Sequence, residues 1–190
     1  MKRRYFRLAI DEYVKGRWYL DEPTDLAGQE IDDIWAFIQG RPVEAPGALR
    51  IPLARPGKPL AFDLTTAAMS PVVNTPVAAV FRELAPEDVQ LFPVEVETQT
   101  EPYYLLNVAR TVRCIDERAC AEVQVYTAAD GRPDRIGEYR AVSGLRIDTS
   151  KVGDERVFRP WGWPPPIIVA GELKEALERT GILGGRFDEV

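Results

Sequence analysis

The C-terminal segment, residues 167–187, constrains the fold more than any other part of the chain. Small and apolar side chains recur there at the spacing of one helical face, at Leu173, Ala176, Leu177 and Thr180. Gly181 follows them, where a left-handed terminating residue needs no Cβ, and Arg179 lies in the last turn, where the helix dipole favours a cation. Apolar runs flank this stretch on both sides. The segment therefore predicts a strand at 167–169, a surface helix near 171–180 and a return strand at 182–187.

Strand-like patterns dominate the rest of the chain. A first pair of strands is expected at 5–10 and 17–20, around a turn at Lys15 and Gly16. Thr75 and Pro76 predict the start of a middle helix near 75–84, with Thr75 as N-cap. Further strands are expected at 60–64, 89–96, 103–115, 121–127 and 138–147. The fold class predicted is α+β, with a mixed, largely antiparallel sheet and few helices.

Prolines restrict the segment 41–59, which carries five of them. Because proline cannot donate to a strand ladder, this segment is expected to be mainly loop, with at most an edge strand at 48–53. A length of 190 residues suits one domain, 1–190, with one sizeable core. An N-terminal sublobe formed by the proline-rich residues 1–70 stays open as an alternative.

The composition is that of an ordinary globular protein, with 45% hydrophobic and 28% charged residues. No apolar run approaches the length of about 20 residues that spans a bilayer. The basic start is followed by Asp11 and Glu12, which interrupt any apolar stretch of signal-peptide length. We therefore expect a cytoplasmic protein without a membrane partner.

The chain contains no histidine, which removes the commonest general base and the commonest metal ligand. Cys114 and Cys120 are the only cysteines, and reduced thiols are expected. No phosphate-binding glycine loop is present, so no cofactor, no metal and no catalytic residue are predicted. One alternative is a carboxylate- and magnesium-dependent hydrolase, built on Asp134, Glu138 and Arg140. The other alternative is a regulatory or structural homodimer.

Acidic residues are concentrated in two windows that contain no basic residue. The windows, 21–33 and 83–101, hold 12 of the 30 acidic residues of a chain whose net charge is −6. Their members are Asp21, Glu22, Asp25, Glu30, Asp32, Asp33, Glu83, Glu87, Asp88, Glu95, Glu97 and Glu101. Such windows are either a solvated surface or a docking face that steers a basic partner. No basic stripe is visible, so nucleic acid is not expected as a direct ligand.

Four tryptophans complete the set of candidate contact residues. Trp161 and Trp163 lie among prolines in the sequence FRPWGWPPP, where a stiff backbone suits either a lid over the core or an interface anchor. Trp18 and Trp35 lie in strand-like apolar contexts and are expected in the core.

The order of several short segments resembles a family of bacterial immunity proteins that is abundant in myxobacteria. The tail carries the main likeness, with Leu173 to Glu178 (LKEALE), then Gly181, then Gly185 to Phe187 (GRF). The supporting segments are VQLFPVEV at 89–96, LNVARTVRCID at 106–116, LRID at 145–148, the VFR of 157–159 and the opening strand at 5–10. They are spread over nearly the whole chain, so the resemblance describes a complete domain.

The resemblance implies a non-catalytic immunity protein that neutralises a cognate toxin of a polymorphic or type VI secretion system by occluding its active site. The partner would be the toxin's effector domain, and the acidic windows favour a basic one, with a nuclease as the preferred guess. The expected contacts are the twelve acidic residues of the two windows together with Trp161 and Trp163. A homodimer stays possible.

Overall fold

In the computed structural model, which describes residues 3–190, most strands belong to two sheets. The helices are α1 Thr75–Leu84 and α2 Gly171–Arg179, and short 3-10 turns occur at Ala36–Ile38, Ala128–Asp130, Pro133–Arg135 and Thr149–Lys151. The strands are β1 Tyr5–Ile10, β2 Tyr19–Leu20, β3 Thr24–Asp25, β4 Leu49–Ile51, β5 Leu53–Arg55, β6 Phe62–Leu64, β7 Pro71–Asn74, β8 Val89–Val96, β9 Tyr103–Val108, β10 Thr111–Val112, β11 Glu122–Val125, β12 Tyr139–Ser143, β13 Val157–Pro160, β14 Ile167–Ala170 and β15 Gly185–Glu189. The predicted α+β class, with both helices at the expected places, is confirmed.

The larger sheet has the strand order β3-β4-β8-β9-β7-β6, and the smaller has the order β10-β13-β14-β1-β15. Each sheet contains one parallel pair, β4 with β8 and β10 with β13, and the other pairings are antiparallel. Two short antiparallel pairs, β2 with β5 and β11 with β12, lie outside these sheets. The mixed, mainly antiparallel character follows from the many short connections between strands.

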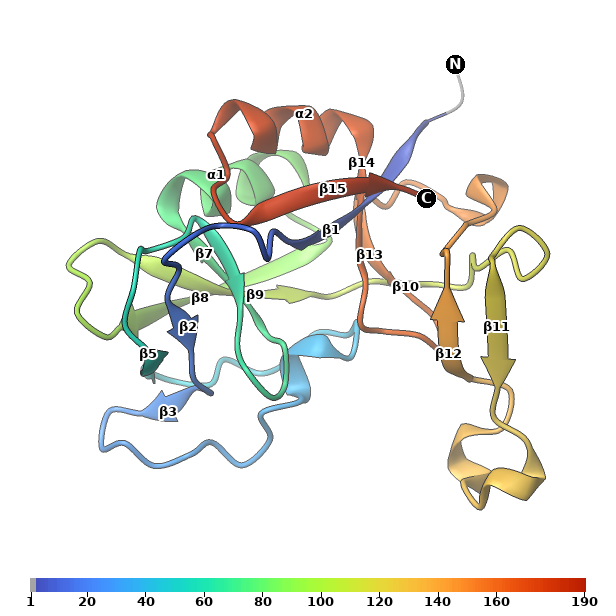
Figure 1. The fold of residues 1–190 in the computed structure, drawn as a ribbon, viewed down its shortest axis with the longest axis horizontal. Coiled ribbons are helices and arrows are strands. Elements are labelled where there is room, and N and C mark those ends of the chain that lie inside the picture. Colours follow the sequence, from blue (N-terminus) through green and yellow to red (C-terminus); the bar gives the residue numbers. More distant parts are fainter. Residues whose placement is uncertain (1–2) are drawn as a thin grey trace.

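The main core fills the space between the two sheets and the two helices, which contact each other (Figure 1). Phe81 of α1 and Leu173 of α2 are fully buried beside Phe6 of β1 and Leu106 of β9. In β14 all four residues are buried, because one face meets this core and the other meets a second cluster around Phe158. This explains why β14 reads as a continuous apolar run instead of an alternating one.

The tail forms the predicted unit. Leu173 and Leu177 are buried on the inner face of α2, and Gly181 has a φ of 69°, as the helix stop requires. The return strand begins later than expected, as β15 Gly185–Glu189. It pairs with β1, so that both ends of the chain lie side by side in one sheet (Figure 1).

Several local expectations are wrong. Strand β1 does not pair with β2; it lies between β14 and β15, and β2 pairs with β5. Strand β4 is not an edge strand, because Pro52 falls just after it and leaves its ladder with β3 and β8 intact. The N-cap of α1 is Asn74, whose side chain accepts a hydrogen bond from the Val77 amide at 3.1 Å. The expected long strand at 103–115 breaks into β9 and β10.

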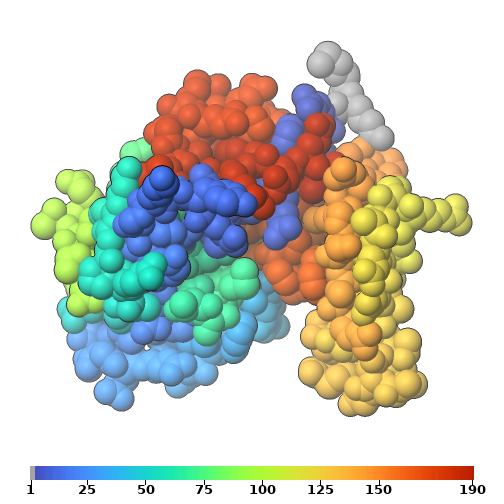
Figure 2. Space-filling model, viewed as in Figure 1, coloured from blue at the N-terminus to red at the C-terminus, as the bar shows by residue number. Residues whose placement is uncertain are grey.

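Strands β11 and β12 form an arm that projects from the body. Figure 2 shows the tip of this arm standing apart from the light-blue part of the body across a notch. Val123 and Val142 pack its base against the cluster around Phe158. At the tip, ion pairs from Arg140 to Asp130 (2.8 Å) and from Arg135 to Glu138 (2.9 Å) hold the turns together.

Candidate functional site

The fold brings a part of each acidic window to one region of the larger sheet. Strand β3 carries Asp25 of the first window, β8 carries Glu95 of the second, and only β4 lies between them. The register places Thr24 opposite Arg50, and Arg50 opposite Glu95. Because adjacent strands are about 4.8 Å apart, the backbones of β3 and β8 lie within roughly 10 Å of each other on this sheet.

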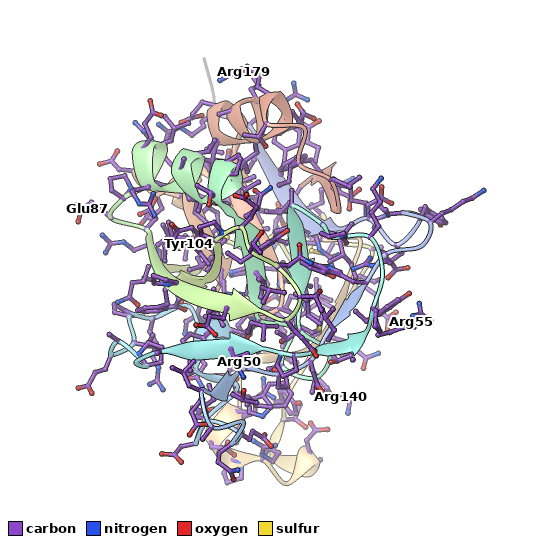
Figure 3. All side chains as sticks on the ribbon, turned by 90° about the vertical axis from the view of Figure 1, so that its left-hand side faces the viewer. Arg50, Arg55, Glu87, Tyr104, Arg140 and Arg179 are labelled. Atoms are coloured by element: carbon purple, nitrogen blue, oxygen red, sulfur yellow. The ribbon has the colours of Figure 1, made fainter. Side chains whose placement is uncertain are left out.

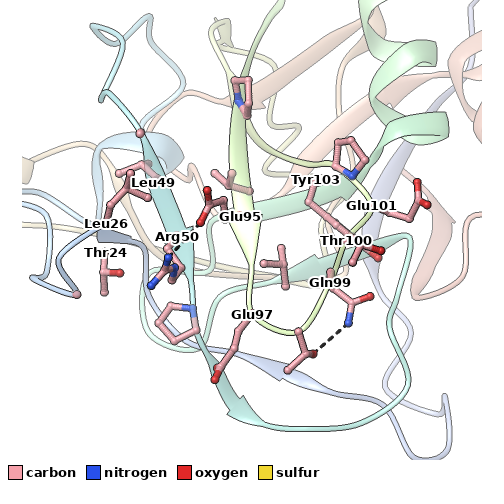
Figure 4. Close-up of a pocket in the computed structure, with 18 of the residues that line it drawn as sticks. Thr24, Leu26, Leu49, Arg50, Glu95, Glu97, Gln99, Thr100, Glu101 and Tyr103 are labelled. Carbon is pink, nitrogen blue, oxygen red and sulfur yellow. Dashed lines mark hydrogen bonds and ion pairs between the residues drawn. The ribbon is translucent and has the colours of Figure 1, made fainter.

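A groove of about 1020 Å³ opens at this place (Figure 4). Its walls come from the loop after β3, from β4 and from β8 with the turn that follows it, and they include Leu26, Glu95, Glu97 and Glu101. Arg50 lies between the windows and pairs with Glu95 at 3.2 Å. The groove therefore carries an excess of negative charge, with a single arginine at its centre, and it suits a segment that brings cationic side chains.

Many of the predicted contact carboxylates hold the protein's own backbone. Glu22 accepts from the amides of Ala67 and Ala68 at 2.6 and 3.0 Å, which fixes the loop between β6 and β7. Similar bonds run from amides of their own loops to Asp21, Asp25 and Asp33, and from the Leu53 amide to Glu97 (2.8 Å). Asp and Glu at such places satisfy turn amides that would otherwise lack partners. These carboxylates still add negative potential, but removing one would also disturb a loop.

Five carboxylates of the windows make no hydrogen bond or ion pair with any residue from 3 to 190. All five are exposed, and they are Glu30, Asp32, Glu83, Glu87 and Glu101. Because their charges are not neutralised within this part of the chain, they are the members of the windows most available to a partner.

A second hollow, of about 640 Å³, lies at the end of α1. Glu83 and Glu87 line it together with Asp154 and Glu155, which belong to neither window. Asp88 lies beneath them, 7% exposed, and accepts from the amides of Arg156 (2.7 Å) and Val157 (3.2 Å). No sequence pattern singles out Asp154 and Glu155, because only the folding of the chain before β13 brings them to α1.

The tryptophans differ from one another in burial. Trp18 is fully buried, as expected, but the prediction of a core position for Trp35 is wrong, since it is 48% exposed next to a short 3-10 turn. Trp161 and Trp163 are half-buried at the base of the arm, where the Tyr139 amide donates to Gly162 at 2.9 Å. Arg113 stacks over Trp161 at 4.2 Å, and Trp163 packs on the cluster around Phe158.

Comparison with protein families identifies the chain. The family model described as "Immunity protein family (Imm11)" matches residues 7–190, almost the full length. The chain belongs to the Imm11 immunity protein family. A search of curated proteins gives no significant match. Membership of Imm11 indicates a role in toxin neutralisation with a cognate toxin as partner, in agreement with the resemblance carried by the tail.

On the arm of this Imm11 protein, both carboxylates of the enzyme-like pattern, Asp134 and Glu138, form ion pairs with arginines. Asp134 pairs with Arg132 at 3.0 Å, which holds the pKa of that carboxyl below its usual range, and Glu138 and Arg140 are engaged in the pairs described above. Within residues 3–190, no three His, Cys, Asp or Glu side chains come together as metal ligands would. No helix in the same part of the chain has the length and apolarity to cross a membrane.

Proposed function

We propose that this Imm11 protein is a cytoplasmic, non-catalytic inhibitor that binds the effector domain of a cognate secreted toxin and occludes its active site. The observation that supports the site is the groove beside β4, lined by three carboxylates of the second window, Glu95, Glu97 and Glu101, and by the uncharged residues Leu26 and Gly28 of the first. A toxin that acts on nucleic acid needs a cationic surface to hold phosphates, and an acidic groove complements such a surface without any catalytic group. A nuclease is therefore the preferred target.

Co-expression tests the role itself. The candidate toxin is the product of the reading frame adjacent to the gene for this chain. We expect that it arrests growth when expressed alone, that co-expression restores growth, and that the two proteins co-purify. Unaffected growth in both cases, with no complex, would refute the immunity role.

Charge reversal tests the acidic surface separately. Glu30 and Asp32, Glu83 and Glu87, and Glu101 are each changed to lysine as three independent sets, because none of their side chains makes a hydrogen bond or ion pair within residues 3–190. Glu175→Lys, on the exposed side of α2, is the matched control. At low salt, a set that faces the toxin should slow association about tenfold or more, and the effect should shrink as salt rises. Unchanged association for all three sets would exclude the acidic surface and leave the immunity role intact.

A further inference from the structure

A third cavity, of about 380 Å³, lies at the corner where β2 and the turn between β6 and β7 meet. Its walls are largely apolar and include Ile10, Leu64 and Met69, with Tyr19 at the edge. A buried ion pair between Arg17 and Asp63 closes one side, and both side chains are less than 10% exposed. The cavity therefore has a fixed polar wall and apolar walls that suit a carbon-rich side chain.

Exposed apolar side chains gather around this cavity. Among residues 3–190, seven large hydrophobic side chains are exposed, and three of them belong to this corner or to the loop leading into it: Tyr13, Tyr19 and Met69. The guanidinium of Arg55 stacks on the Tyr19 ring at 4.0 Å. Tyrosine, methionine and arginine are the residue types enriched in the centres of protein interfaces, and a rigid stacked pair loses little freedom on binding.

Met69 is held in an unusual backbone conformation at the cavity. Its φ of 56° is one that side chains other than glycine rarely adopt. The turn is fixed on both sides of it, since the Thr65 amide donates to the Ser70 carbonyl at 3.0 Å and the Ser70 amide donates to Thr65 Oγ1 at 2.9 Å. The result is a methionine displayed at the surface, 47% exposed, at a place where glycine would fit the backbone better.

The exposed charge around this corner is positive on balance, although the chain as a whole is acidic, because three cationic side chains nearby outnumber Glu12, the exposed carboxylate that lines the cavity. Lys15, Arg55 and Lys58 are exposed and form no ion pair with residues 3–190. The loops that carry them run side by side, because the Lys58 amide donates to Gly16 at 2.7 Å and the Trp18 amide donates to Lys58 at 3.2 Å. A partner segment at the corner would thus bring negative charge around its apolar side chain.

The corner is continuous with the acidic groove. Glu97 in the groove accepts from the amide of Leu53, the first residue of β5, and Arg55 at the end of β5 pairs with Tyr19. Figure 3 shows this side of the molecule, with Arg50 in the groove and Arg55 farther along the same stretch of chain. A protein bound in the groove would reach the corner without a break in the surface.

We propose that this corner anchors the toxin: the cavity takes one aromatic or long aliphatic side chain of the cognate toxin, flanked by carboxylates that pair with Lys15, Arg55 and Lys58. The inference rests on the proposed function and assigns the groove and the corner different roles in binding. The acidic groove governs how fast the toxin associates, and the corner governs how slowly it leaves, because buried apolar anchors act mainly on dissociation.

An exchange experiment measures how fast the toxin dissociates from each variant. The complex with the adjacent gene's product is purified with each variant, mixed with an excess of fluorescent wild-type chain, and the exchange rate is followed. Met69→Gly removes a side chain from the cavity wall and suits the backbone, and Tyr19→Ala removes the stacked ring. Each should raise the dissociation rate about tenfold or more, as expected for central interface residues. Ile136→Ala, which truncates an equally exposed side chain on the arm, should leave it within twofold.

The outcomes separate the two proposals. A complex whose dissociation rate is the same for Met69→Gly, Tyr19→Ala and Ile136→Ala refutes the anchor alone, while absence of a complex with the wild-type chain refutes both. Urea unfolding of each variant confirms that it is folded. Self-association of the wild-type chain that disappears in Met69→Gly would assign the corner to a second copy and overturn the inference.

Charge reversal at the corner tests the chemistry of the partner. The double variant Lys15→Glu and Lys58→Glu should weaken the complex and speed dissociation, whereas Arg179→Glu on α2 should not. Tighter binding by the double variant would mean that the flanking toxin residues are basic, which contradicts the proposed partner segment.

Discussion

Arg17 and Asp63 form an ion pair in the interior, with side chains 7% and 3% exposed. Burial raises the pKa of Asp63, against the opposing effects of the Leu64 amide and the charge of Arg17. The pair joins the entry to β2 with β6, and it forms one wall of the proposed anchor cavity. Its two charges depend on each other, because either one alone would be left uncompensated in the interior.

Removing one partner should therefore lower the free energy of unfolding more than removing both. We expect Asp63→Ala to lower the free energy of unfolding by about 3–5 kcal/mol, since it leaves Arg17 buried without its counter-ion. The double variant Arg17→Met and Asp63→Leu replaces the pair by apolar groups, and its free energy of unfolding should fall by far less. Urea denaturation of the two variants checks this, and equal losses would contradict the dependence of one charge on the other.

The true N-cap of α1 gives a second prediction. Asn74→Ala removes the acceptor for the Val77 amide and should lower the free energy of unfolding by about 1 kcal/mol. Thr75→Ala removes only an exposed hydrogen bond from the hydroxyl to the Pro102 carbonyl, at 3.1 Å, and should cost less than half as much. Thermal or urea unfolding ranks the two variants, and the reverse order would restore Thr75 as the cap.

Substitutions of two adjacent carboxylates just after α1 should change the stability of the protein by very different amounts. Asp88→Ala leaves the amides of Arg156 and Val157 without an acceptor and Arg110 without its partner, so we expect the free energy of unfolding to fall by about 3 kcal/mol. Glu87→Ala, one residue earlier, removes an exposed and unpaired carboxylate and should change stability by no more than about 0.5 kcal/mol. Chemical denaturation distinguishes them; similar values would show that Asp88 does not hold the chain before β13.

Alkaline pH should destabilise the protein through Cys114. Burial raises the pKa of this thiol from 9.0 to about 12. Between these pH values the unfolded chain loses the proton while the folded chain keeps it, so stability falls as pH rises, by at most about 1.4 kcal/mol per pH unit. Stability should be flatter across this range in Cys114→Val. The pKa of Tyr139 is also raised, by burial and then by Glu117, to about 12, so the variant should retain part of the slope.

Features that depend on neighbouring residues were predictable from the sequence. The 3.6-residue periodicity of α2, the glycine that ends it and the apolar run of β8 all appear where expected. The same applies to the burial of Trp18 in its apolar strand context. Local patterns missed Trp35, because its apolar neighbours form a short 3-10 turn that packs through Phe37 and leaves the indole outside.

The sequence by itself determined the α+β class, the two helices and the family, since periodicity, glycine stops and motif order are written along the chain. Only the tertiary structure decided that β1 pairs with β14 and β15, that only β4 lies between Asp25 on β3 and Glu95 on β8, and that Asp154 and Glu83 line the same hollow. It also decided which carboxylates are bound to backbone amides and which are free. Strand partners and hydrogen-bond partners are chosen between residues far apart in the chain, and no local pattern records where the chain returns.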